Sequence, residues 1–183
     1  MLLTFKLNLP TQITTNRLLL QRLKREDAEE IFTVYASHPE ATKFMAWPTH
    51  QSIADTHSFL DYAEKAWDEG QSCTYAIRTG SGHPLVGSIG AQNVDGKIMF
   101  GYTIGANYWN KGYATEACKA LVDRLRLQRG VYRIHTFVDA ENVASARVLE
   151  KAGLVEEARL KKWFRFVNQG NEPKDCILYN LVF

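Results

Sequence analysis

A strand, a short polar turn and the start of a helix are expected between Gly101 and Ala117, and this stretch could bind an anion. Gly112 and Ala114 stand where the helix should begin, and the first backbone N–H groups of a helix have no partners inside it. The helix dipole adds partial positive charge there, and Lys111 adds a full one. Because small residues allow close approach to the backbone, the turn is predicted to hold a pyrophosphate.

Gly112 also has a simpler interpretation, in which it only forms a tight turn between strand and helix. The stretch lacks the GxxxxGK[ST] pattern of a P-loop. The first strand and the acidic residue about 20 positions later are also not arranged as a dinucleotide-binding fold requires. A second motif is therefore needed to decide between a turn and a phosphate site.

That second motif runs from Asn142 to Leu154 and directly follows the next expected strand. Asn142 and Ser145 are good helix-capping residues, which is their structural interpretation. They are also one helical turn apart, so they share one side of the helix. From Gly101 to Leu154 the expected order is a strand, a phosphate-binding helix, a second strand and a helix whose first residues are polar.

Together these segments resemble the cofactor motifs of the GCN5-related N-acetyltransferase (GNAT) superfamily, and within it the RimJ/RimL type of ribosomal-protein N-acetyltransferase. The stretch Trp109–Ala117 resembles the acetyl-CoA pyrophosphate loop, and Asn142–Leu154 resembles the second cofactor motif. Thr15-x-Arg17-Leu18-Leu19-Leu20 resembles the opening strand. The resemblance extends from Ile13 to the C-terminus and implies a GNAT fold over one domain, residues 1–183.

The resemblance implies acetyl-CoA as co-substrate and no metal. Asn142 is expected to bind the pantetheine arm, and Ser145 is expected to contact the cofactor and to act as general acid toward the CoA thiolate. The backbone groups expected to contact acetyl-CoA are those of Tyr102, Thr103, Ile104, Lys111, Gly112, Tyr113, Ala114 and Thr115.

The implied reaction is direct attack of a primary amine on the thioester, within a ternary complex. The acceptor is a protein N-terminal amine or a small-molecule amine, and Trp47 and Trp163 are predicted to line its site. The same segments also contain Phe44, Trp67 and Phe164, and each of the five aromatic residues by itself is more typical of a core. An isolated histidine such as His50 or His57 is usually not catalytic.

Several positions depart from the pattern of the superfamily. Leu149 stands where many relatives carry a catalytic tyrosine, and Met99 and Phe100 stand where many carry a glutamate. A glutamate that serves some ribosomal-protein enzymes as base would fall near Phe164. The general base is left open, and the carboxylates considered for it, each more typical of a structural role, are Asp139, Glu116 and Asp175.

Two alternatives stay open, the first because of these departures and the second only by analogy with the family. The chain could bind acyl-CoA as a sensor or partner module without turnover, or it could associate with RNA or the ribosome. The second is disfavoured because the formal net charge is only +2. Neither nucleic acid nor a membrane is expected as a partner, and no apolar run reaches the length of about 18 residues that spans a bilayer.

The elements that must carry these motifs follow from periodicity and turn residues. Strands are expected at residues 14–23, 73–78, 85–91, 97–104, 132–138, 154–166 and 174–182. Helices are expected at residues 25–37, 52–67, 113–128 and 142–152. The fold class is α/β (α+β), with a mixed, mostly antiparallel sheet of six to seven strands and helices on both faces.

The three cysteines, Cys73, Cys118 and Cys176, are far apart and form no metal-ligand pattern. They are expected to be small buried hydrophobic residues, which fits a reducing compartment. We therefore expect a cytoplasmic protein, and a homodimer is kept as an open alternative.

Overall fold

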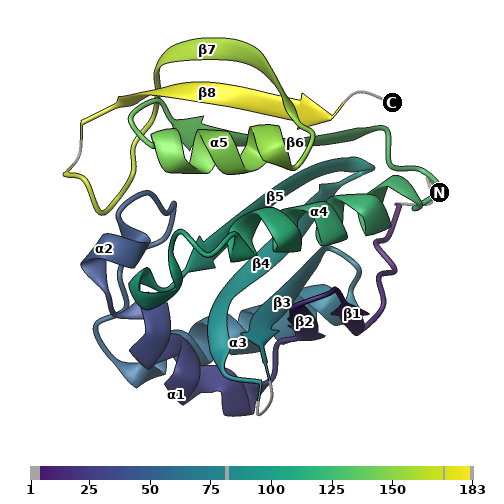
Figure 1. The fold of residues 1–183 in the computed structure, drawn as a ribbon, viewed down its shortest axis with the longest axis vertical. Helices are drawn as coiled ribbons and strands as arrows, with labels where there is room; N and C mark the ends of the chain where they lie inside the picture. Colours follow the sequence, from purple (N-terminus) through teal and green to yellow (C-terminus); the bar gives the residue numbers. More distant parts are fainter. Residues whose placement is uncertain (1–4, 81–82, 171, 182–183) are drawn as a thin grey trace.

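The computed structural model describes residues 5–80, 83–170 and 172–181, and within them the sheet has eight strands in the order β1-β2-β3-β4-β5-β6-β8-β7 (Figure 1). The strands are β1 (Gln12–Thr14), β2 (Leu18–Arg22), β3 (Ser72–Thr79), β4 (Leu85–Val94), β5 (Lys97–Ile104), β6 (Arg133–Asp139), β7 (Val155–Phe164) and β8 (Lys174–Leu181). The helices are α1 (Ala28–Ile31), α2 (Pro39–Thr42), α3 (Ile53–Asp68), α4 (Tyr113–Arg126) and α5 (Val143–Lys151). The mixed, mostly antiparallel sheet expected from the sequence is confirmed.

The expectation of six to seven strands was too low. Residues 14–23 were predicted to be one strand, but they form part of β1, a turn and β2, which pair antiparallel. Thr15 makes the turn, because its Oγ1 accepts a hydrogen bond from the N–H of Leu18 at 2.9 Å. A threonine hydroxyl that bonds nearby backbone in this way favours a turn over a continuous strand.

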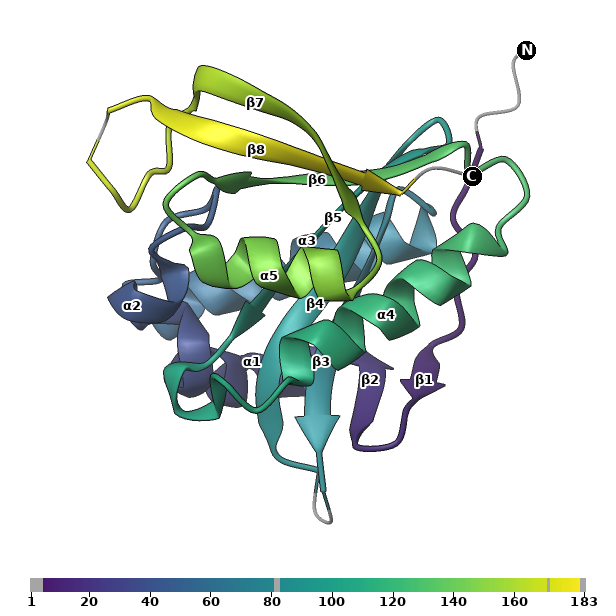
Figure 2. The ribbon, with the colours of Figure 1, turned by 45° about the horizontal axis from the view of Figure 1, so that its top comes forward.

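Helices cover both faces of the sheet, as the pattern predicted: α4 and α5 lie on one face, and α1 and α3 on the other (Figure 2). The alternation of side chains along β3 divides its residues between the two layers. Tyr75 and Ile77 belong to the core under α4 and α5. Ala76 packs into the second core, with Leu60 of α3.

The helix expected at residues 25–37 is irregular. It starts as a 3-10 turn, continues as α1 and ends as a π-helical segment, Phe32–Ala36. Such π segments recur at functional sites, and this one carries Tyr35, whose ring reaches the cavity described below. The short α2, in which Pro39 occupies the first turn, was not predicted from the sequence.

Strands β5 and β6 are the parallel pair of the sheet, and they part early. Their register has three pairs, which end at Met99 and His135. Beyond that point β5 continues to Ile104, hydrogen-bonded to β4 on its other side. The edge of β5 that faces β6 therefore carries backbone groups in need of a partner, because buried N–H and C=O groups are almost always paired.

The remaining expectations concern burial. Cys73, Cys118 and Cys176 are free and buried, as predicted. Of the residues described, no helix is long and apolar enough to cross a membrane. The sequence also predicts turns at residues 80–82 and 168–171. Ser81, Gly82 and Asn171 of these turns, and Val182 at the end of the last expected strand, lie outside the described residues.

Candidate active site

The predicted phosphate loop ends β5 and opens α4. Gly112 caps the helix at φ +78, and Asn110 also has a positive φ of 60. No side chain caps the first N–H groups of α4, so they stay available to an anion. The indole N–H of Trp109 donates to the carbonyl of Ile104 at 2.7 Å and fixes the loop to the end of β5.

Arg17, in the turn between β1 and β2, braces this loop from the side. Its Nη1 donates to the carbonyl of Lys111 at 2.9 Å, and its guanidinium lies 5.2 Å from the centre of the Tyr113 ring. Its Nε donates to Glu116 at 2.7 Å, and Glu116 also accepts from the Thr15 hydroxyl at 2.6 Å. The opening motif therefore supports the phosphate loop, a role that its sequence did not reveal.

The Glu116 carboxylate is half-buried, and burial by itself would raise its pKa. The hydrogen bonds from Thr15 and Arg17 outweigh burial, so the pKa of Glu116 lies below its ordinary value. Glu116 is thus held as a charged structural group. It does not line the cavity beside β5, which removes the geometric support for it as a base.

A cavity of about 530 Å³ opens where β5 and β6 part. Tyr102 and Thr103 line it from β5, Asp139 lines it from β6, and Asn142 and Ser145 line it from the start of α5. Ile104 and the loop residues 111–115 are not part of its lining. The two predicted cofactor motifs are therefore joined by the β5–β6 opening, with the cavity at one end and the phosphate loop at the other.

Within this cavity the hydroxyls of Tyr102 and Ser145 form a hydrogen bond of 2.9 Å, in which either atom can donate. Burial raises the pKa of Tyr102 well above its usual range, so the phenol stays protonated. Asn142 acts as the helix cap, because its Oδ1 accepts from the N–H of Ser145 at 3.1 Å. Leu149, at the position of the superfamily's tyrosine, is buried and also lines the cavity.

The opposite wall of the cavity comes from the segment between α1 and α3. Trp47, which was predicted to line the acceptor site, lines this cavity, and its ring centre lies 5.2 Å from that of His50. The Nδ1 of His50 is 2.8 Å from the Thr56 hydroxyl. Burial lowers the pKa of His50 more than the nearby Asp55 raises it. His50 therefore lines the cavity as a neutral imidazole near pH 7, which its isolated position in the sequence did not indicate.

Asn168, between β7 and β8, holds this wall in place. Its Oδ1 accepts from the backbone N–H of Thr49 at 3.0 Å and from the Thr49 hydroxyl at 3.3 Å. Its Nδ2 donates to the carbonyls of Thr42 at 2.7 Å and Trp47 at 2.9 Å. The neighbouring Gln169 donates to Asp139 Oδ2 at 2.9 Å. The loop between β7 and β8 therefore contacts both walls of the cavity.

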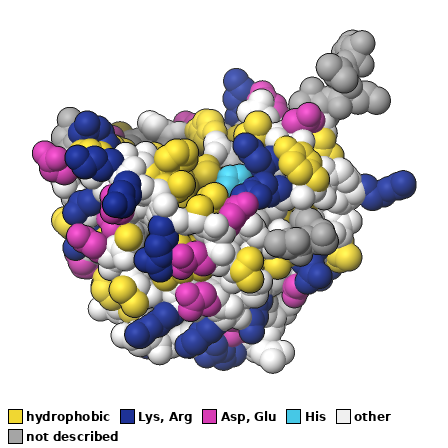
Figure 3. Space-filling model, turned by 90° about the horizontal axis from the view of Figure 1, so that it is seen from above, with side chains coloured by type: hydrophobic (Ala, Val, Ile, Leu, Met, Phe, Trp, Pro, Cys, Tyr) yellow, Lys and Arg dark blue, Asp and Glu magenta, His cyan; other side chains and the backbone are white. Residues whose placement is uncertain are grey.

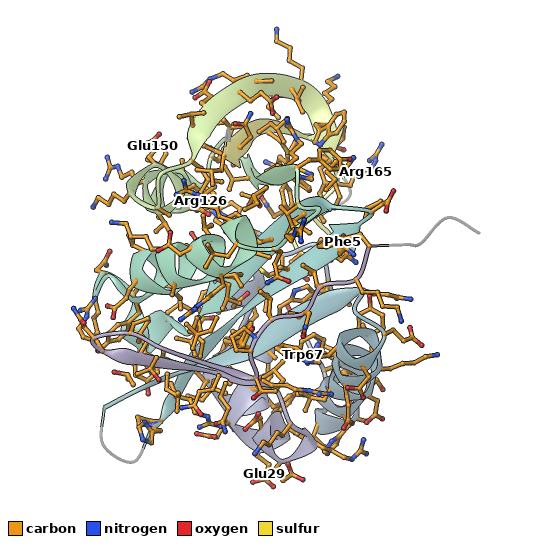
Figure 4. The ribbon with its side chains drawn as sticks, turned by 90° about the vertical axis from the view of Figure 1, so that its right-hand side faces the viewer. Phe5, Glu29, Trp67, Arg126, Glu150 and Arg165 are labelled. Carbon is orange, nitrogen blue, oxygen red and sulfur yellow. The ribbon has the colours of Figure 1, made fainter. Side chains whose placement is uncertain are left out.

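The other predicted aromatic residues differ in their placement. Phe44 lines the cavity, whereas Trp163 does not, and 57% of the Trp163 residue is exposed. Phe164 packs against Phe137 and Phe166 at centroid distances of 5.0 Å. Trp67 projects from α3 toward the sheet, 5.0 Å from the ring of Tyr75 (Figure 4).

The two remaining carboxylates considered as bases also differ. Asp139 is 1% exposed and lines the cavity, where its Oδ1 accepts from the N–H of Glu141 at 2.8 Å. Asp175 accepts from the N–H of Lys162 at 2.8 Å and is not among the cavity residues. Of the three candidates, Asp139 alone lines the cavity as far as the structure describes it.

Known proteins share this sequence pattern and this fold. A family model described as an acetyltransferase (GNAT) domain matches residues 17–155. The uncharacterized N-acetyltransferase p20 of Bacillus licheniformis is 28% identical over 152 residues, which cover 81% of this chain and 85% of that protein. A GNAT-family acetyltransferase from Bacillus anthracis superposes with a TM-score of 0.82 at 25% identity, over 93% of this chain and 98% of that one. RimL, a ribosomal L7/L12 alpha-N-protein acetyltransferase in complex with coenzyme A, shares the fold, with a TM-score of 0.84 at 14% identity over 94% and 98% of the two chains.

Proposed function

Because this chain belongs to the GNAT acetyltransferase family, we propose that it transfers an acetyl group from acetyl-CoA to a primary amine. The acceptor is a protein N-terminal amine or a small-molecule amine. We place the reaction in the cytoplasm, a location supported by three buried cysteines that remain free thiols.

The parting of β5 and β6 is the observation that carries this proposal. Residues 100–104 present backbone N–H and C=O groups on the side that β6 has left, and a pantetheine arm, with its two amides, could pair with them. At the far end of the opening, the uncapped start of α4 suits a pyrophosphate, with Lys111 beside it. The residues present therefore fit acetyl-CoA.

Acetyl-CoA supplies an acetyl group activated as a thioester. The amine nitrogen bonds to the carbonyl carbon as the C–S bond breaks. The nitrogen releases its proton to water, and the leaving sulfur takes up a proton to give the CoA thiol. We propose that Ser145 Oγ donates the proton that the leaving sulfur takes up. The Tyr102 hydroxyl, 2.9 Å from Ser145 Oγ, would stabilise the negative charge that develops on this oxygen. Holding amine and thioester together lowers the entropic part of the barrier.

Binding is tested by calorimetric titration of acetyl-CoA into the wild-type protein and the Gly112→Glu variant. The new carboxylate would stand where the pyrophosphate binds, so we expect micromolar affinity to fall at least 100-fold. Gly80→Glu is the matched control, because Gly80 has a similar φ of +66 and nothing lies within 4 Å of a Cβ built there. Equal affinity of wild type and Gly112→Glu would contradict the proposed cofactor site.

A module that binds acyl-CoA without turnover remains a second candidate, favoured by Leu149 at the position of the superfamily's tyrosine. Ser145→Ala separates the two functions. If the chain is an enzyme, release of free CoA in the presence of amine falls in this variant while acetyl-CoA affinity is nearly kept. Binding without CoA release by the wild type, over a broad set of amines, would favour the module.

Nucleic acid is not part of the proposal. The formal net charge is +2, and acidic side chains lie among the basic ones on the face seen in Figure 3. Tight nucleic-acid binding needs basic groups concentrated on one surface.

A further inference from the structure

We infer that the acceptor is a small monoamine with an aromatic body, an arylalkylamine, rather than a polyamine or a protein N-terminus. This inference rests on the proposed N-acetyltransferase function and deepens it. The wall of the cavity that faces β5 and β6 carries six aromatic rings. These belong to Tyr35, Phe44, Trp47, His50, Phe59 and Tyr62.

These rings form a connected surface. Trp47 lies 6.4 Å from Tyr35 in an edge-on arrangement and 5.2 Å from His50, and His50 lies 6.4 Å from Phe59. Such centroid distances are those of aromatic pairs that pack edge-to-face or tilted. A flat apolar ring of a ligand would extend this arrangement, because Phe44 and Tyr62 complete the same wall.

The wall is also preorganised. Asn168 forms three hydrogen bonds with the backbone of Thr42, Trp47 and Thr49, and a fourth with the Thr49 hydroxyl, so it fixes the chain before, at and after Trp47. The backbone N–H of His50 donates to the carbonyl of Ala36 at 2.9 Å. A rigid wall loses little conformational entropy when a ligand binds, so it selects for shape.

Charge narrows the ligand further. Asp139 is the one carboxylate among the described residues that line the cavity, and no Lys or Arg is among them. His50, with its pKa lowered by burial, adds no positive charge near pH 7. The negative charge of Asp139 therefore balances one ammonium group. The second ammonium of a diamine would lose its water among apolar rings without gaining a partner, which is unfavourable.

Size points the same way. The volume of about 530 Å³ is that of a small-molecule site, and it must also hold the thioester end of acetyl-CoA. A phenyl or indole ring with a two-carbon amine arm suits the space that is left. A peptide would have to continue out of the cavity, past apolar rings that offer few backbone partners.

The inference is tested by kcat/KM, measured as CoA release, for four amines at saturating acetyl-CoA. These are 2-phenylethylamine, n-butylamine, 1,4-diaminobutane and a tetrapeptide that begins with serine. We expect 2-phenylethylamine to exceed each of the others at least 30-fold. A preference for the diamine or the peptide, with acetyl-CoA binding intact, would overturn the aromatic acceptor and leave the proposed function standing.

Variants then place the ring in the cavity. Trp47→Ala should raise the KM for 2-phenylethylamine at least tenfold, whereas Trp47→Phe should keep this KM close to the wild-type value. Neither variant should change acetyl-CoA affinity more than twofold. Tyr132→Ala is the control, because Tyr132 is an aromatic residue that is 63% exposed and does not line the cavity. Phe59→Leu gives a second measurement should Trp47→Ala fail to fold. An unchanged KM in both cavity variants would overturn the inference.

If acetyl-CoA binds but none of the four amines is acetylated, saturation-transfer NMR of 2-phenylethylamine with the acetyl-CoA complex shows whether the aromatic amine binds. Binding to the wild type that Trp47→Ala abolishes would support the aromatic site while contradicting turnover. Absence of binding to the wild type would overturn the aromatic site itself.

Discussion

The hydroxyl oxygens of Tyr102 on β5 and Ser145 on α5 lie 2.9 Å apart, in the cavity that opens where β5 and β6 part. Leu149 occupies the position in α5 where many members of the superfamily carry a tyrosine. In this chain the phenol beside Ser145 is that of Tyr102, which comes from β5. This pair places two hydrogen-bonded hydroxyls in the cavity, one from β5 and one from α5.

We predict that Tyr102→Phe lowers kcat about 10- to 100-fold, within the range for loss of one proton-transfer contact. Because the two hydroxyls act as one unit, Ser145→Ala combined with Tyr102→Phe should cost little more than Ser145→Ala alone. The measurement is CoA release under saturating substrates, with acetyl-CoA affinity determined in parallel. Fully multiplicative losses in the double variant would show that the two hydroxyls act independently.

The brace on the phosphate loop gives a second prediction. Arg17→Ala removes the hydrogen bonds to Lys111 and Glu116, so we expect acetyl-CoA affinity to fall about tenfold, or about 1.4 kcal/mol. Arg25→Ala is the matched control, because Arg25 forms an exposed ion pair with Asp61 outside the site. Calorimetric affinities of the two variants should differ, and equal values would contradict the loop-positioning role of Arg17.

Much of this architecture could be predicted from the sequence, because local signals specify it. Asp95 and Gly96, both at positive φ, make the tight β4–β5 turn, and Gly112 stops the strand and starts α4. The motifs around Gly112 and Ser145 were placed on the correct elements for the same reason. Each depends on residues within a few positions of one another.

The parts that sequence reasoning missed are contacts between distant segments. Arg17 and Glu116 are 99 positions apart, and Asn168 is 121 positions from Trp47. No periodicity or spacing rule connects such residues. Trp163 and Trp47 looked equivalent as aromatic residues in the predicted acceptor segments. Trp163 lies on β7 and is exposed, whereas the backbone of Trp47 is held in the cavity wall by its hydrogen bond to Asn168.

Acid stability tests the environment of Glu116. Its folded-state pKa is lowered, so its contribution to the free energy of unfolding is fully present above the ordinary pKa of 4.5 and is lost as the pH falls through the folded value. Melting temperatures of wild type and Glu116→Gln should therefore differ at pH 7 and converge on acidification below 4.5. The melting temperature of the control Glu26→Gln, at an exposed position, should be closer to that of the wild type at pH 7. A difference that is constant with pH would contradict the charged, hydrogen-bonded state of Glu116.

Asn168 provides the last prediction, which separates the two halves of the site. Asn168→Ala removes four hydrogen bonds, two of them to the backbone carbonyls of Thr42 and Trp47, and we expect a loss of about 2 kcal/mol of unfolding free energy. The wall that carries Trp47 should loosen while the phosphate loop, held by Arg17, stays in place. KM for the amine should therefore rise severalfold, and acetyl-CoA affinity should change less than twofold. A parallel loss of acetyl-CoA affinity would mean that the loop between β7 and β8 supports the whole site rather than its acceptor wall.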